Sequence, residues 1–128
     1  MQVEKHGKIV SLATAEEMSA LDAPIVIDAR SVIERAECVS GAPIEGSHSV
    51  PFNIPTDDDS EPIPRTPAQY QAALEASGCL PADKAAAIIT HCGGGGRGAK
   101  SQKVLLDMGF TNVHNGGSAD AIRAAIGR

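Results

Sequence analysis

The sequence has 128 residues, a length that predicts a single domain spanning residues 1–128. Lys and Arg number 11 against 16 Asp and Glu, and the net charge of −5 excludes the strongly basic surface typical of a nucleic-acid-binding domain. No apolar run approaches the roughly 18 residues that cross a membrane. We therefore expect no nucleic acid and no membrane among the partners.

Short apolar runs alternate with helical stretches in the first half of the chain, as in α/β domains. Thr14, with Glu17 three residues later, forms a capping box that begins a helix. The β-branched run that ends in Asp28-Ala29-Arg30 is typical of a buried central strand. In chain order we expect a strand at 9–13, a helix from Thr14, a strand at 25–27, helical turns at 31–37 and an edge strand at 50–54.

The second half begins with an acidic, proline-rich stretch, residues 56–67, which predicts a solvated surface loop. The alternation then resumes, and we expect a helix at 67–77, a strand at 85–90, a helix at 98–108, a strand at 112–115 and a helix at 118–126. The sequence therefore predicts one α/β domain, with a mainly parallel central sheet of about five strands and helices on both faces.

The N-terminus and the cysteines indicate a cytoplasmic protein. The first residues, Met1 to His6, lack the apolar core of a secretory signal. The three cysteines, Cys38, Cys79 and Cys92, are odd in number and show no Cys-x-x-Cys spacing. Because this pattern fits neither a disulfide framework nor a zinc site, we expect a reducing compartment, no metal and no cofactor.

The most informative segment joins the strand at 85–90 to the helix that follows it. Cys92 stands at the carboxyl end of this strand, where ligands bind in open α/β sheets. After Cys92 the sequence continues with Gly93, Gly94, Gly95, Gly96, Arg97 and Gly98. Glycines let several backbone N–H groups turn inward, and a helix N-terminus adds partial positive charge. The segment therefore predicts an anion-binding loop that stabilises Cys92 as a nucleophilic thiolate.

With these features the chain resembles the rhodanese family of sulfurtransferases over about residues 9–126. The strand ending in Asp28-Ala29-Arg30 is similar to the family's strand that ends in Asp-x-Arg, and residues 44–51 are similar to its Ile-x-Gly-Ala-x-x-Ile-Pro segment. Residues 92–97 are similar to its six-residue active loop, and Gly116-Gly117 matches its glycine pair before the last helix.

The chain departs from the family pattern at four places. Pro43 replaces the histidine that commonly precedes the Ile-x-Gly-Ala segment, and the stretch between Arg30 and Ile44 is longer than usual. Ser47 stands where alanine is usual, and no tryptophan follows Gly117. Within the loop, Arg97 is the one side chain that could help select a donor.

The resemblance implies a sulfur transfer in two steps. Cys92 attacks a small anionic sulfur donor such as thiosulfate, becomes a persulfide, and then passes the sulfur to a thiol or a sulfur-acceptor protein. The glycines, Arg97 and Gly98 are expected to bind the donor, with Arg97 on its oxyanion. Asp28 and Arg30 are expected to support the loops structurally. By strand alternation, His91 points away from Cys92.

The sequence leaves open two alternative functions from other classes of protein. The first is a phosphatase or arsenate reductase of the dual-specificity type on the same fold, which carries five residues between its cysteine and arginine. Only four separate Cys92 from Arg97. The second is a non-catalytic module that binds partners or senses sulfur, although such modules typically replace the cysteine.

Overall fold

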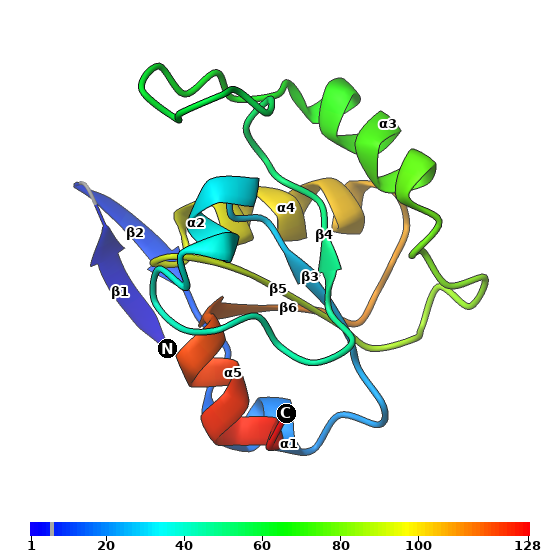
Figure 1. Ribbon diagram of the computed structural model, residues 1–128. Helices are drawn as coiled ribbons and strands as arrows, with labels where there is room; N and C mark the ends of the chain where they lie inside the picture. Colours follow the sequence, from blue (N-terminus) through cyan, green and yellow to red (C-terminus); the bar gives the residue numbers. More distant parts are fainter. Residues whose placement is uncertain (6) are drawn as a thin grey trace.

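A computed structural model describes residues 1–5 and 7–128, so that His6 and the side chain of Lys5 lie outside the described part. Its centre is a four-stranded parallel sheet in the order β4-β3-β5-β6 (Figure 1). The strands are β3 (Ile25–Asp28), β4 (His48–Ser49), β5 (Ile88–Cys92) and β6 (Val113–Ser118). The predicted α/β class is confirmed.

The first predicted strand belongs to a separate hairpin, which is why the parallel sheet has four strands instead of about five. In this hairpin β1 (Gln2–Lys5) pairs antiparallel with β2 (Lys8–Ser11). The two strands are adjacent in sequence, and pairing with so close a partner closes only a short loop, at little entropic cost. Figure 1 shows the hairpin projecting beside the sheet.

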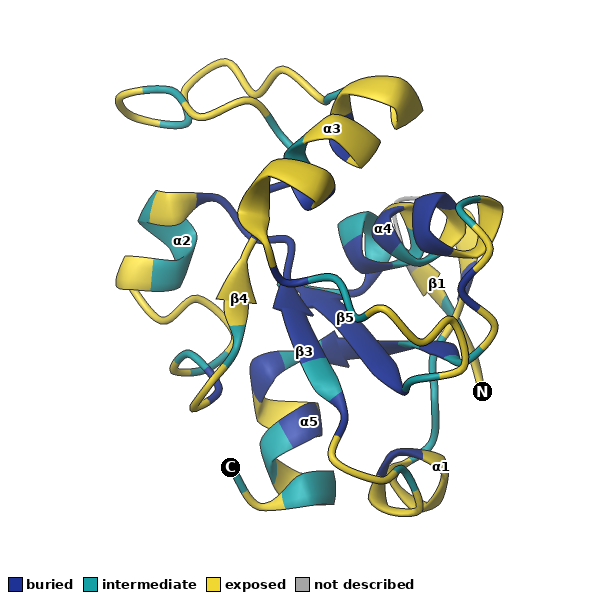
Figure 2. Cartoon of the chain, turned by 90° about the vertical axis from the view of Figure 1, so that its right-hand side faces the viewer, coloured by how far each residue is buried: buried dark blue, intermediate teal, exposed yellow. Residues whose placement is uncertain are grey.

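Helices cover both faces of the sheet (Figures 1 and 2). On one face, α1 (Ala15–Ser19) packs against α5 (Ala119–Ile126). On the other face, α3 (Pro67–Ser77) packs against α4 (Gly96–Asp107). The short helix α2 (Val32–Ala36) follows the carboxyl end of β3. Within the described residues, no helix is long and apolar enough to cross a membrane.

Alternating strand residues build two hydrophobic cores. Ile27 and Ile88 face α3 and α4, whereas Val26 and Ile89 face α1 and α5. The central strands are buried on both sides, as the dark blue of β3 and β5 in Figure 2 shows. This packing fixes the carboxyl end of β5, where Cys92 lies.

Side-chain caps place the helix starts close to where the sequence predicts them. Capping boxes begin α1, α2 and α3, with Thr14, Ser31 and Thr66 as the N-cap residues. Ser118 caps α5, and Gly78 ends α3 in the left-handed conformation at φ 72°.

The predicted edge strand at 50–54 is wrong in its bounds, because the regular pairing occupies only His48–Ser49. Val50 and Phe52 still donate backbone hydrogen bonds to the carbonyls of Asp28 and Ala29. Regular pairing ends at Ser49 because its partner strand β3 ends at Asp28. Pro51 lies between the two donors on the side of this edge strand that faces away from β3, where the N–H group that proline lacks is not needed for pairing. The chain then leaves the sheet for the acidic loop, which is mostly exposed.

Candidate active site

Cys92 ends β5 with its side chain buried on the side of the sheet that faces α4. The residue is 2% exposed, and its Sγ accepts a hydrogen bond from the backbone N–H of Gly95 at 3.0 Å. A pocket of about 420 Å³ opens beside it, and Gly94, Gly96 and Arg97 form part of the wall. The thiol thus lies within a glycine loop, at the start of a helix and next to a cavity.

Two of the loop positions have no room for a side chain. Gly95 adopts φ 106°, and a Cβ atom there would lie 2.8 Å from Cδ2 of Leu12. At Gly98, a Cβ atom would lie 2.6 Å from Oδ1 of Asn115 and 3.1 Å from the backbone of His91. Gly98 therefore lets α4 pack closely on β5, which brings the helix N-terminus to Cys92.

Asn115 on β6 ties the loop to its surroundings. Its Nδ2 donates hydrogen bonds to the carbonyls of Gly95 at 2.9 Å and Ser11 at 3.2 Å. Its Oδ1 accepts the N–H of Gly117 at 3.2 Å. One buried side chain therefore joins the active loop, the N-terminal hairpin and the glycine pair before α5. Nothing in the sequence around Asn115 singles it out for this role, because its partners come from distant segments.

Arg97, which the sequence places on the donor oxyanion, forms a bidentate ion pair with Glu34 of α2. Nη1 lies 2.5 Å from Oε1 and Nη2 lies 2.9 Å from Oε2. These hydrogen bonds from Arg97 lower the pKa of Glu34 to about 2. The same hydrogen bonds raise the pKa of Arg97, and the nearby Cys92 raises it further. The guanidinium is thus a cation held in place by Glu34, on a residue that lines the same pocket as Cys92.

The sequence does not identify Glu34 as a residue of the site. The spacing from Ser31 to Glu34 matches a capping box, and Glu34 Oε1 does accept the N–H of Ser31 at 3.1 Å. That spacing identifies a helix start, but it carries no information about Arg97, which lies 63 residues away.

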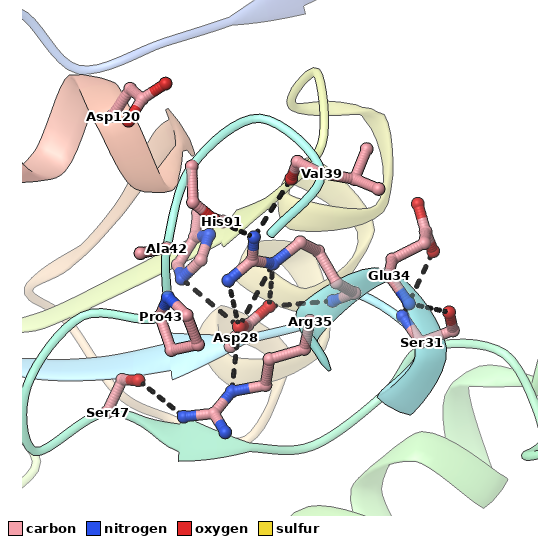
Figure 3. A network of polar contacts seen from close by, with 12 residues as sticks. Asp28, Ser31, Glu34, Arg35, Val39, Ala42, Pro43, Ser47, His91 and Asp120 are labelled. Atoms are coloured by element: carbon pink, nitrogen blue, oxygen red, sulfur yellow. Dashed lines mark hydrogen bonds and ion pairs between the residues drawn. The ribbon is translucent and has the colours of Figure 1, made fainter. Parts of the chain in front are cut away.

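A second polar network lies buried behind the loop, with Asp28 at its centre (Figure 3). Arg30 donates from Nε to Oδ1 at 3.0 Å and from Nη2 to Oδ2 at 2.8 Å. Arg35 adds a hydrogen bond from Nε at 3.0 Å and reaches Ser47 Oγ with Nη2. Burial alone raises the pKa of Asp28, but the hydrogen bonds from Arg30 and the neighbouring positive charges outweigh it and lower that pKa.

Arg30 also holds the segment that follows α2. Its Nη1 donates to the carbonyls of Val39 at 2.9 Å and Gly41 at 2.6 Å. Ser40 in this segment lies near Gly93, since a Cβ atom on that glycine would be 3.8 Å from Ser40 Oγ. The structure thus places Asp28 and Arg30 away from the pocket, in a network that positions a loop beside Cys92.

His91 lies on the opposite side of β5 from Cys92. It is fully buried, and in the described structure neither ring nitrogen has a hydrogen-bond partner. Its Nε2 is 3.9 Å from Oδ2 of Asp28. Burial lowers the pKa of His91, which keeps the ring neutral near pH 7.

The remaining cysteines and histidines lie elsewhere. All three cysteines are free; Cys38 is exposed, and buried Cys79 accepts a hydrogen bond from Ser77 Oγ at 2.9 Å. His48 lies exposed on β4, while Nε2 of His114 is 2.7 Å from Oδ1 of Asn112. Across the described part of the chain, no group of three or more His, Cys, Asp or Glu residues could hold a metal ion.

Comparisons with solved structures identify proteins of similar fold. EanB in complex with ergothioneine matches with a TM-score of 0.53 and 23% identity, over 79% of this chain and 26% of that chain. EanB with a cysteine persulfide in a tetrahedral intermediate state matches with a TM-score of 0.51 and 20% identity, with the same coverage of 79% and 26%. The 3-mercaptopyruvate sulfurtransferase from Leishmania major matches with a TM-score of 0.51 and 18% identity, over 81% of this chain and 29% of that chain.

At these low identities, the similarity shows a shared fold and no more. This chain spans between a quarter and a third of the length of each of these proteins. No curated protein sequence matches the chain. The model of the rhodanese-like domain, however, matches residues 11–120. Because that match covers most of the sequence, the chain belongs to the rhodanese-like domain family.

Proposed function

We propose that this protein is a sulfurtransferase, which moves a sulfane sulfur from thiosulfate or a similar donor to a thiophilic acceptor through a persulfide on Cys92. The observation that carries the proposal is the hydrogen bond from the Gly95 N–H to Cys92 Sγ, within a glycine loop at the start of α4. A donor N–H and the positive end of a helix both stabilise negative charge on sulfur.

The transfer balances without an external oxidant or reductant. The Cys92 thiolate attacks the outer sulfur of thiosulfate, and the bond between the two donor sulfurs breaks. Sulfite leaves with the electron pair of that bond, and Cys92 becomes the persulfide anion. The acceptor then attacks the outer sulfur, so that Cys92 is released as a thiolate. The persulfide is an anion like the thiolate, and the Gly95 N–H and the N-terminus of α4 are expected to stabilise both.

Arg97 is the residue that we assign to the anionic donor. Its ion pair with Glu34 restricts the guanidinium, and Arg97 lines the same pocket as Cys92. From there it can contact the donor oxygens and the departing sulfite. Asp28 and Arg30 serve as structural supports, because they lie in a buried network outside the pocket.

Three further observations support this proposal. The structures of similar fold include a sulfurtransferase and an EanB structure with a cysteine persulfide. Three free thiols fit a reducing compartment, and we propose a cytoplasmic location, where a small thiol or a sulfur-acceptor protein takes up the sulfur. The loop also holds four residues between Cys92 and Arg97, fewer than the five of the phosphatases.

The experiment is an assay of thiocyanate formation from thiosulfate and cyanide. Cys92→Ser should abolish activity, whereas Cys38→Ser and Cys79→Ser serve as matched controls that retain it, because neither thiol lies in the loop. Aryl phosphate hydrolysis is measured on the same protein and should stay at background. Full activity of Cys92→Ser, or robust phosphatase activity of the wild type, contradicts the proposal.

A further inference from the structure

Cys92 shares its pocket with three cationic side chains that come from two parts of the chain. Lys8 lies on β2 of the hairpin, while Arg97 and Lys100 lie at the start of α4. Arg97 pairs with Glu34 and is the residue assigned above to the oxyanion of the donor. Both lysines are exposed, and among residues 1–5 and 7–128 neither takes part in an ion pair. Beyond Arg97, the side chains that can supply positive charge to a larger ligand of this pocket are therefore Lys8 and Lys100. Lys100 Nζ lies 5.6 Å from the centre of the Phe52 ring, so this lysine turns away from that ring when it contacts the ligand.

The remaining wall of the pocket is apolar and encloses more space than thiosulfate fills. Ile9, Val10 and Ala99 line it together with the lysines. Its volume of about 420 Å³ falls within the range of about 300–1,000 Å³ that is typical of sites for organic ligands. Thiosulfate has no apolar part, so it leaves this wall without a partner. A larger donor with an apolar body matches the pocket better.

The hairpin is held against the active loop, which gives Lys8 a defined place in the pocket. Leu12 and Val10 pack beside Gly95, where a Cβ atom would lie 2.8 Å and 3.6 Å from their side chains. Asn115 accepts the N–H of Ala13 on its backbone carbonyl at 2.8 Å and donates from its side chain to the Ser11 carbonyl. β2 therefore forms one wall of the site.

We propose that Lys8 and Lys100 are specificity-determining residues, which bind an anionic group at the far end of an organic sulfur donor. The apolar body of the donor packs on Ile9, Val10 and Ala99. This inference rests on the proposed function of Cys92. With an aryl thiosulfonate, the thiolate attacks the terminal sulfur, the bond between that sulfur and the sulfonyl sulfur breaks, and the arenesulfinate leaves with the electron pair. The persulfide forms as it does with thiosulfate.

A matched pair of donors tests the role of the two lysines. Benzenethiosulfonate and para-carboxybenzenethiosulfonate carry the same reacting sulfur, and only the second has a distal anionic group. We expect the wild type to prefer the carboxylated donor by about tenfold in kcat/KM, which corresponds to two partly exposed charge contacts. Lys8→Ala and Lys100→Ala should each reduce this preference about threefold, and the double variant should remove it.

Comparing the ratio of two donors within each variant cancels general effects on folding and on the reactivity of Cys92. Lys103→Ala is the matched control, because Lys103 lies on the same helix but pairs with Asp107 outside the pocket of Cys92. This variant should keep the wild-type ratio. A double variant with the wild-type preference overturns the inference. Absence of sulfur transfer from both donors instead contradicts the proposed function.

A binding measurement separates the two ideas further, because it needs no turnover. Benzenesulfonate and para-carboxybenzenesulfonate resemble the donors but carry no transferable sulfur. NMR titration of the wild type should give a Kd about tenfold lower for the carboxylated sulfonate, and the double variant should bind both equally. Equal affinity of the wild type for the two sulfonates also overturns the inference.

Discussion

Glu34 on α2 holds both terminal nitrogens of Arg97 on α4, at 2.5 Å and 2.9 Å, across a gap of 63 residues in sequence. Through this pair, the helix that follows β3 positions the only cation within the active loop. Both side chains are about one-quarter exposed, so solvent screens the pair only in part. The relationship makes Glu34 a positioning residue for a site to which it contributes no reacting atom.

Removing the Glu34 carboxylate should weaken both the fold and the activity. We expect Glu34→Ala to reduce the free energy of unfolding by about 1–2 kcal/mol, because Arg97 loses its partner while it is half-buried and Ser31 loses half of its capping box. Urea denaturation measures this loss. Glu34→Gln retains an oxygen that accepts hydrogen bonds, so its free energy of unfolding should lie between those of Glu34→Ala and the wild type. Equal stability of all three proteins contradicts the role of the pair.

Arg97 itself is predicted to contribute to catalysis with thiosulfate. A hydrogen bond from a charged donor to the oxyanion is worth about 1.5–3 kcal/mol, so Arg97→Ala should lower kcat/KM about ten- to a hundredfold. Arg97→Lys keeps the charge but loses the bidentate geometry, and it should recover part of the loss. If both variants match the wild type, the arginine has no role in donor binding.

The prediction from sequence succeeds where local chemistry decides the structure. Short-range signals predict the strand that ends at Cys92, the helix that follows the glycines, and the helices capped by Thr14 and Ser118. The structure has a strand or helix at each of these places. The family model over residues 11–120 agrees with the resemblance drawn from these motifs.

Pairing between distant segments could not be predicted in the same way. The ion pair of Glu34 with Arg97, and the three contacts of Asn115, exist only because the sheet order brings α2, α4 and β6 together. The edge strand also differs from its predicted bounds, because its pairing begins at His48 and ends where β3 ends, at Asp28. The presence of Lys8 in the pocket could not be predicted either, because the position of the hairpin depends on its packing against the active loop.

Two glycines of the loop region should respond in opposite ways to a methyl group. In Gly98→Ala the new Cβ meets Asn115 and the backbone of His91, and overpacking of this kind costs about 1–3 kcal/mol. Gly96→Ala is the matched control, because nothing lies within 4 Å of its Cβ position, and alanine in the first turn should stabilise by about 0.4–1 kcal/mol. Thermal unfolding of both variants checks this; a lower Tm for Gly96→Ala than for Gly98→Ala contradicts it.

The buried His91 should make stability depend on pH. Its pKa is lowered in the folded protein, mainly by burial, so the unfolded chain takes up a proton at a higher pH than the folded chain. Stability is therefore fully present above the ordinary pKa of 6.5 and is lost as the pH falls below it. Urea denaturation at about pH 7 and about pH 5 should show this loss, and His91→Leu should show a smaller one. If the wild type and His91→Leu lose the same stability between these two pH values, a group other than His91 causes the pH dependence.

Mass spectrometry of the intact protein after incubation with thiosulfate shows whether Cys92 carries the transferred sulfur. We expect a gain of one sulfur atom per chain, located on the peptide that contains Cys92 and removed by cyanide with formation of thiocyanate. Cys92→Ser should gain none, although Cys38 and Cys79 are still present. A sulfur found on Cys38 or Cys79, or a wild-type protein that gains no sulfur from thiosulfate or from either thiosulfonate, would contradict the role of Cys92 as sulfur carrier.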